Sequence, residues 1–189
     1  KPVLVIVPKT LLWQWQEEIN TLLNIPSAVW NGKEWIDENG FNYPNRGLED
    51  IKKCPRKIGI VSQGLIVSKS PIMEYLLSKE YECVIIDEAH NILNSEYKNN
   101  GDDWQDYRLS VFEEIIKEGR KFGFYLTLSS QRPADISPTI LSQTHNYLVH
   151  RLVNEKDLRM LENTMPTLDK SSYQIIPSLG KGEAIITGN

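Results

Sequence analysis

The sequence is poor in cysteine, has no long apolar run and carries no excess of positive charge. Its two cysteines are not spaced as CxxC and no histidines cluster near them, which argues against a disulfide framework and a structural zinc site. The longest apolar run, at residues 3–7, is far too short to cross a bilayer, and the N-terminus lacks the pattern of a signal peptide. The formal charge of −4 argues against a protein that coats nucleic acid with a uniformly basic surface, although it is compatible with a local basic strip. These absences together predict a cytoplasmic protein without a membrane-spanning segment.

The composition that is present is ordinary for a globular protein, with 40% hydrophobic and 24% charged residues. A length of 189 residues suffices for one α/β domain with a core of its own, so we expect a single domain over residues 1–189. The chain opens on an apolar strand of the kind that is buried on both faces of a parallel sheet. We therefore also expect it to be a segment of a longer protein.

Short apolar runs alternate with helical patterns, which is typical of βα units on a largely parallel sheet. The apolar runs predict strands at residues 3–7, 27–30, 57–62, 82–86, 122–129, 147–152 and 183–187. Helical patterns lie at residues 10–23, 70–78, 104–118 and 154–162, with Thr10 and Asn154 as expected N-caps, and residues 94–103 are expected to form an exposed loop. Asn39-Gly40 is a strong two-residue turn and predicts a small β-hairpin insertion near residues 34–43. The expected fold class is α/β.

The most informative stretch is an apolar strand that runs into Asp87-Glu88-Ala89-His90. Sheets of α/β proteins bind their ligands at the carboxyl ends of the strands, where this strand delivers two adjacent carboxylates. Hydrolysis of a nucleoside triphosphate uses such a pair, because one carboxylate holds the Mg²⁺ that bridges the phosphates and the next orients or deprotonates the attacking water. Asp87 fits the first role, Glu88 fits the second, and His90 is placed to link the site to a neighbouring element. The alternative is a solvated acidic turn after a strand.

Residues 2–90 resemble the first motor domain of superfamily 2 helicases, in particular its Swi/Snf-like branch. The resemblance is carried by residues 3–12 with Trp15 and Glu18, similar to motif Ia, by residues 60–65, similar to motif Ib, and by the DEAH sequence at 87–90, similar to motif II. It implies that Lys9, Thr10 and Gln63 face a nucleic-acid backbone, in contacts that position the strand without reading its sequence. Lys9 and Thr10 are equally compatible with a simple strand exit and helix N-cap, and Trp15 is expected in the core.

From residue 90 onward the resemblance changes to HerA-type hexameric DNA translocases. It is carried by four segments, at residues 118–123, 128–133, 151–157 and 182–188. In such enzymes a polar residue on the strand beside the acidic motif senses the γ-phosphate, a role that maps to Gln131. An arginine supplied in trans to a neighbouring subunit's nucleotide maps to Arg120, whose planar guanidinium suits the charge on a transferred phosphoryl group. Alternatively, Gln131 is an ordinary residue at the end of a strand. Arg120 is then a positive charge after the end of a helix, where it interacts favourably with the helix dipole.

The two resemblances imply a P-loop ATPase motor with a three-layer, RecA-like core whose mostly parallel sheet is incomplete at the N-terminus. We interpret the chain as a hybrid, helicase-like over residues 1–90 and HerA-like over 91–189. The resemblance implies ATP and Mg²⁺ as cofactors, bound at Asp87, Glu88 and His90, and DNA and further copies of the chain as partners, the latter as a hexamer. No G-x-x-x-x-G-K-[ST] phosphate loop occurs in the sequence, and in both families this loop precedes the segment present here.

The leading hypothesis is therefore a segment of an ATP-hydrolysing DNA helicase or translocase, with Asp87 and Glu88 as its hydrolytic pair. The missing phosphate loop favours a second hypothesis, a non-catalytic α/β fragment that has motor-like motifs and no ATP turnover. A third hypothesis is a module that only binds nucleic acid, which predicts binding that weakens with salt.

Overall fold

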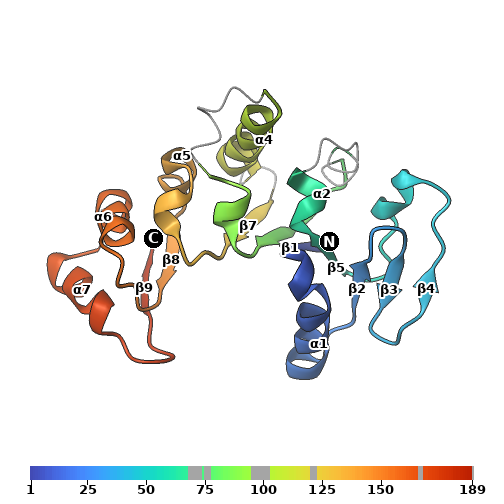
Figure 1. Ribbon diagram of the computed structural model, residues 1–189, viewed down its shortest axis with the longest axis horizontal. Helices are drawn as coiled ribbons and strands as arrows, with labels where there is room; N and C mark the ends of the chain where they lie inside the picture. Colours follow the sequence, from blue (N-terminus) through green and yellow to red (C-terminus); the bar gives the residue numbers. More distant parts are fainter. Residues whose placement is uncertain (68–73, 75–77, 95–102, 120–122, 166–167, 189) are drawn as a thin grey trace. The chain divides into compact units, whose positions relative to one another are not determined.

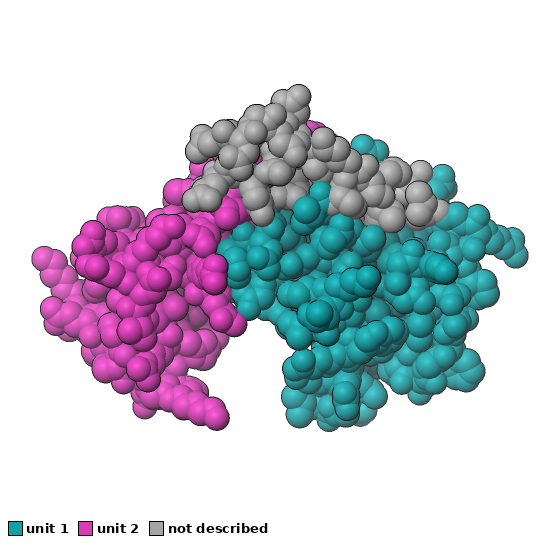
Figure 2. Space-filling model, in the orientation of Figure 1, with its two compact units in different colours: residues 1–92, 118–130 teal, residues 93–117, 131–189 magenta. Residues whose placement is uncertain are grey.

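The computed structural model describes residues 1–67, 74, 78–94, 103–119, 123–165 and 168–188. The chain divides into two compact units that alternate along the sequence (Figure 2). Unit 1 comprises residues 1–92 and 118–130, and unit 2 comprises residues 93–117 and 131–189. Whether the two units make up one domain, as the length predicts, stays a prediction.

A seven-stranded sheet forms the centre of unit 1, with the strand order β4-β3-β2-β5-β1-β6-β7 (Figure 1). Its strands are β1 (Val3–Val7), β2 (Ser27–Trp30), β3 (Trp35–Asp37), β4 (Asn42–Tyr43), β5 (Ile58–Ser62), β6 (Cys83–Ile86) and β7 (Tyr125–Leu128). Five of them, β2, β5, β1, β6 and β7, run parallel, while β3 pairs antiparallel with β2 and with β4. The predicted mostly parallel sheet is thus confirmed, as is the β-hairpin insertion.

Strand β1 lies in the middle of the sheet and is buried on both faces, because Leu4, Val5, Ile6 and Val7 are each at most 2% exposed. On one face, Val5 and Val7 pack with Leu12 and Ile19 of α1 (Leu12–Leu23). The prediction of a strand buried on both faces at residues 3–7 is therefore confirmed. Only a central strand has neighbouring strands at both edges and packed side chains on both faces.

Two details of the predicted first helix are wrong. Thr10 is not an N-cap, because Lys9–Leu11 form a 3₁₀ turn before α1 and no side chain caps either segment. Leu22 and Leu23 belong to the helical pattern predicted at residues 10–23, which we expected to bury its apolar side chains, but they are 77% and 62% exposed. Apolar spacing alone therefore overstates the length of α1 that is buried.

A network around the buried Asp37 fixes the hairpin of β3 and β4. Its carboxylate accepts backbone N–H bonds from Asn39 and Phe41, both 3.0 Å long, and side-chain bonds from the Tyr43 hydroxyl at 3.0 Å and the Arg56 guanidinium at 2.6 Å. Burial alone would raise the pKa of this carboxyl, but the four donors outweigh it and hold the pKa of Asp37 below its usual value. The connection between the strands has four residues rather than the predicted two, because Asp37 caps it from inside.

Unit 2 contains helices and a second, smaller sheet. Its helices are α4 (Asp103–Gly119, which ends in unit 1), α5 (Pro138–Leu141), α6 (Glu155–Thr164) and α7 (Lys170–Ile175), and its two strands, β8 (Asn146–Val149) and β9 (Ile185–Gly188), pair antiparallel. Val149, Leu161, Met165 and Ile176 form one buried apolar cluster in it. The predicted N-cap of α6 is confirmed, since the Asn154 side chain accepts bonds from the N–H groups of Lys156 and Asp157.

Other predictions fall largely on residues that the structure does not describe. The predicted helix at 70–78 and the loop at 94–103 lie mostly outside the described residues. Among the helices that are described, none is long and apolar enough to cross a membrane.

Substituting Asp37→Ala is expected to lower the free energy of unfolding by about 3 kcal/mol at pH 7, because it leaves the N–H groups of Asn39 and Phe41 and the Tyr43 hydroxyl without their buried acceptor. A carboxylate whose pKa is lowered by folding stabilises the protein above its unfolded pKa of about 4 and loses this effect as the pH falls through the folded value. Urea unfolding at pH 7 and pH 3 should therefore show a difference between wild type and variant that shrinks at pH 3. Glu155→Ala, which breaks an exposed pair with Arg159, should cost less than about 1 kcal/mol. If Asp37→Ala lowers the free energy of unfolding equally at pH 7 and pH 3, the stabilising role of the ionised Asp37 carboxylate is contradicted.

Candidate functional site

Polar side chains gather where four neighbouring parallel strands end. Strand β5 runs into α2 (Gln63–Val67), β1 runs into the 3₁₀ turn at Lys9–Leu11, β6 runs into the DEAH turn at residues 87–90, and β7 is followed by Ser129 and Ser130. Because these strands are parallel and in register, their carboxyl ends meet at one edge of the sheet (Figure 1). The structure thus brings the predicted Lys9, Thr10, Gln63, Asp87, Glu88 and His90 to the same edge.

The DEAH turn is bonded into the strands on both of its sides. The Asp87 N–H donates to the Ile6 carbonyl of β1 at 2.9 Å, and the Ala89 N–H donates to the Ser129 carbonyl after β7 at 2.8 Å. These two bonds extend the ladders of β6 beyond its last residue. The position of the turn is therefore set by the sheet itself, which makes it a rigid platform for its side chains.

Glu88 has an unusual backbone conformation. Its φ of 47° and ψ of 50° are left-handed, which few residues other than glycine, asparagine and aspartate adopt. The Gln63 side-chain amide supports this conformation, since it donates to the carbonyls of Asp87 at 2.6 Å and of Glu88 at 3.2 Å. Backbone strain of this kind persists where the surroundings fix it, and it is common at functional sites.

Gln63 itself was expected to face nucleic acid. Its side chain is only 8% exposed, and its amide group is bonded to the DEAH turn. The structure therefore gives Gln63 a supporting contact that the resemblance did not indicate, and a contact with nucleic acid stays a prediction.

The Asp87 carboxylate receives one donor on each oxygen. The Glu88 N–H donates to Oδ1 at 3.0 Å, and the indole N–H of Trp15 donates to Oδ2 at 3.2 Å. Trp15 was predicted only as a core residue. It is half-buried and packs against the apolar cluster that includes Val5, Val7, Leu12 and Ile19. Its contact with Asp87 spans 72 positions of sequence, so no local pattern could have indicated it.

Glu88 and His90 form the second part of the turn. The His90 Nδ1 lies 3.4 Å from the Glu88 Oε2 and 3.0 Å from the Ser130 hydroxyl. Both side chains are largely buried, at 22% and 15% exposure. His90 thus joins the DEAH turn to the segment after β7, as its position predicts, and its role towards a cofactor stays a prediction.

The structure describes three of the four remaining predicted site residues. Lys9 and Thr10 are exposed at the same sheet edge, directly after β1. Gln131 is exposed and belongs to unit 2, whereas the neighbouring Ser130 belongs to unit 1 and contacts His90. Arg120 lies outside the described residues. The structure therefore does not test a γ-phosphate sensor at Gln131 or an arginine supplied in trans.

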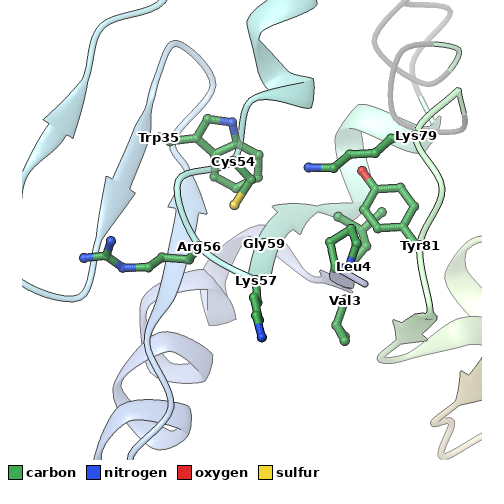
Figure 3. A pocket seen from close by; sticks show the side chains of 10 residues that line it. Val3, Leu4, Trp35, Cys54, Arg56, Lys57, Gly59, Lys79 and Tyr81 are labelled. Atoms are coloured by element: carbon green, nitrogen blue, oxygen red, sulfur yellow. The ribbon is translucent and has the colours of Figure 1, made fainter.

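A shallow hollow, open to solvent, lies at the opposite edge, near the amino ends of β1 and β5 (Figure 3). Figure 3 shows Lys79 beside Tyr81 and Cys54 beside Trp35. The Lys79 ammonium donates to the Lys52 carbonyl at 2.8 Å, and a Cβ on Gly59 would lie only 3.0 Å from the Trp35 ring. The floor of the hollow is thus closely packed, and the hollow lies away from the carboxylates.

Comparisons with known proteins relate the chain to DNA motors. It is 34% identical to the DNA double-strand break repair helicase HerA of Sulfurisphaera tokodaii over 137 residues, which are 72% of this chain and 23% of that protein. It is also 34% identical to the HerA of Pyrococcus furiosus over 123 residues, 65% of this chain and 20% of that protein. The chain is homologous to HerA-type helicases. It spans about a quarter or less of the length of these two relatives.

A solved structure shares the fold. The genome packaging NTPase B204 of Sulfolobus turreted icosahedral virus 2, in complex with AMPPCP, superposes with a TM-score of 0.55 over 100% of this chain and 92% of that chain, at 20% identity. This likeness confirms the predicted fold class, a mixed α/β fold of the kind found in P-loop ATPases. No protein-family model matches the chain.

Removing the Gln63 support should loosen the DEAH turn. Gln63→Leu leaves the carbonyls of Asp87 and Glu88 without their buried donor, which costs about 1–3 kcal/mol. Hydrogen exchange should show the Ala89 amide at least about 5-fold less protected than in wild type, because the local opening becomes easier by that energy. Gln14→Leu, on the exposed face of α1, should leave the protection of Ala89 unchanged. Equal protection in both variants would show that the amide does not hold the turn.

Proposed function

We propose that the chain is the hydrolytic part of an ATP-dependent DNA motor of the helicase or translocase type. One observation carries the proposal: two adjacent carboxylates, Asp87 and Glu88, stand at the carboxyl end of a central parallel strand, in a turn that is bonded to both neighbouring strands. The names of the relatives, DNA repair helicases and a genome packaging NTPase, support a DNA motor. The resemblance of residues 2–90 to superfamily 2 helicases and the hybrid origin of the chain belong to the same proposal.

In this proposal Asp87 is the protein ligand of a Mg²⁺ ion that enters with the nucleotide. Among the described residues no three His, Cys, Asp or Glu side chains gather in a way that could hold a metal. Mg²⁺ in phosphate sites is nevertheless usually held by one or two carboxylates, with phosphate oxygens and waters as its remaining ligands. A single Asp87 with a fixed orientation fits that arrangement. When bound, the ion would neutralise charge that develops on the β- and γ-phosphates.

Glu88 is the proposed residue that orients the attacking water. The water oxygen attacks the γ-phosphorus, the bond to the β,γ-bridging oxygen breaks, and the proton of the water passes towards the Glu88 carboxylate. His90 lies within 3.4 Å of that carboxylate and contacts Ser130 at 3.0 Å, so it holds Glu88 against the end of β7. This role requires the Glu88 side chain to be fixed, and its left-handed backbone supports that requirement.

The remaining roles rest on the resemblances. Gln131 would sense the γ-phosphate, and Arg120 would act in trans on the nucleotide of a neighbouring copy, which would make the active assembly an oligomer. Lys9, Thr10 and Gln63 would contact the DNA backbone. The exposure of Lys9 and Thr10 beside the DEAH turn is the observation that supports a DNA contact.

A second candidate function is binding without turnover. The sequence contains no glycine-rich phosphate loop, whose backbone N–H groups would wrap the phosphates. A stable α/β module with this turn but without that loop would bind DNA or nucleotide weakly and hydrolyse nothing. ATP hydrolysis by the chain separates the two candidates.

Glu88→Gln is expected to reduce Mg²⁺-dependent ATP hydrolysis by at least about 100-fold, because an amide cannot accept the proton of the attacking water. The rate of phosphate release should be measured with and without duplex DNA. Glu82→Gln, which changes a carboxylate at the other end of the same strand, serves as the control and should keep the wild-type rate. A rate that Glu88→Gln leaves unchanged removes Glu88 from its role, and a wild-type chain without Mg²⁺-dependent hydrolysis favours the second candidate.

Lys9→Ala is expected to weaken DNA binding and to reduce the slope of log K against log salt concentration by about 1, as the loss of one phosphate contact does. Fluorescence anisotropy of a labelled duplex between low and moderate salt measures both quantities. Lys57→Ala removes an equal charge at the opposite edge of the sheet and should leave the slope unchanged. If the two variants behave alike, Lys9 does not contact DNA.

A further inference from the structure

We propose that Trp15 is a positioning residue of this site, whose indole N–H fixes the orientation of the Asp87 carboxylate. The functional part of this inference rests on the proposed role of Asp87 as a Mg²⁺ ligand. The contact itself is independent of that role, because it joins two described side chains at 3.2 Å.

The indole group suits this task for two reasons. Its nitrogen only donates hydrogen bonds, so it fixes an acceptor and never competes with a carboxylate for a cation. The ring is large and has only two rotatable bonds, so its position is well defined once it is packed. Trp15 is packed: it lies against the cluster of Val5, Val7, Leu12 and Ile19 that joins α1 to the sheet.

The Asp87 carboxylate is held at both ends by this arrangement. The Glu88 N–H bonds to Oδ1, and the Trp15 indole bonds to Oδ2. Rotation of the carboxylate about its Cβ–Cγ bond would break both bonds, so its plane is fixed relative to the sheet. Each oxygen keeps a further lone pair with which it can bind a cation. Donors that orient a metal-binding carboxylate typically change metal affinity by about 10–100-fold when they are removed.

Other tryptophans provide a comparison within the same chain. Trp13 lies two positions earlier on α1 and is 48% exposed. Trp35 is buried in the sheet and donates to the backbone carbonyl of Ile51 at 3.1 Å. Trp15 differs from both because its acceptor is a carboxylate that belongs to the candidate site. The pairing also makes the orientation of Asp87 depend on the position of α1, the helix that follows the exposed Lys9 and Thr10.

The first experiment tests the hydrogen bond without any ligand. The ¹H–¹⁵N indole cross-peaks of the whole chain are recorded by NMR, and the Trp15 peak is assigned by its loss in Trp15→Phe. In Asp87→Asn the neutral amide oxygen is a weaker acceptor than a carboxylate. The Trp15 indole proton should therefore shift upfield by several tenths of a ppm, while the Trp35 peak stays in place. A Trp15 peak that Asp87→Asn does not move overturns the inference.

The second experiment tests the consequence for the metal. Calorimetric titration with MnCl₂ in the presence of ADP measures cation binding to wild type, Asp87→Asn, Trp15→Phe and the matched control Trp13→Phe, each checked for folding by circular dichroism. Trp15→Phe keeps an aromatic ring but loses the donor, and it should bind Mn²⁺ about 10-fold more weakly. Trp13→Phe should bind as wild type does.

The outcomes separate the two proposals. Equal Mn²⁺ affinity in wild type and Trp15→Phe overturns the role of Trp15 and leaves the proposed function in place. Mn²⁺ binding that Asp87→Asn does not weaken overturns the proposed role of Asp87 as a metal ligand. In that case an upfield shift of the Trp15 peak in Asp87→Asn would still establish the contact as a structural one only.

Discussion

The continuation of the sheet's hydrogen bonding beyond the last residue of β6 is the constraint on which the site depends. A turn after a strand is usually free to vary, but here the Asp87 N–H and the Ala89 N–H remain in the ladders to β1 and to the end of β7. The turn is therefore held on both sides, by the buried β1 and by the end of β7. Side chains from the two flanking helices, Trp15 from α1 and Gln63 from α2, add bonds that a loop in solvent would not make.

Much of the fold and the location of the site could be predicted from the sequence, because both follow from local patterns. The apolar run at 3–7 identifies a strand buried on both faces, and the run at 82–86 identifies a parallel neighbour that is buried on one face and partly buried on the other. Asp87-Glu88 must then stand at the carboxyl edge. Asn39-Gly40 likewise indicates the hairpin, since few residues other than glycine suit a left-handed turn. These predictions depend only on neighbours in the chain.

The parts that could not be predicted depend on residues far apart in the chain. Trp15 has the spacing of a core residue, and nothing in its neighbourhood indicates a carboxylate 72 positions away. Gln63 resembles a residue of a nucleic-acid contact, yet its burial and its two carbonyl partners arise only when β5 and β6 lie on either side of β1. The length of the hairpin loop was also missed. Asp37 caps the loop through the N–H groups of Asn39 and Phe41, and Arg56 from the segment before β5 pairs with the same carboxylate.

The left-handed backbone of Glu88 has a consequence for attempts to make this protein more heat-resistant. A residue with a Cβ atom in this conformation costs about 1–2 kcal/mol relative to a right-handed one, and glycine largely avoids the cost. Selection for thermal stability alone would thus favour glycine at this position and remove the carboxylate with the strain. A library screened only for survival on heating would drift towards well-folded variants that lack the carboxylate proposed to orient the attacking water, the usual conflict between stability and activity.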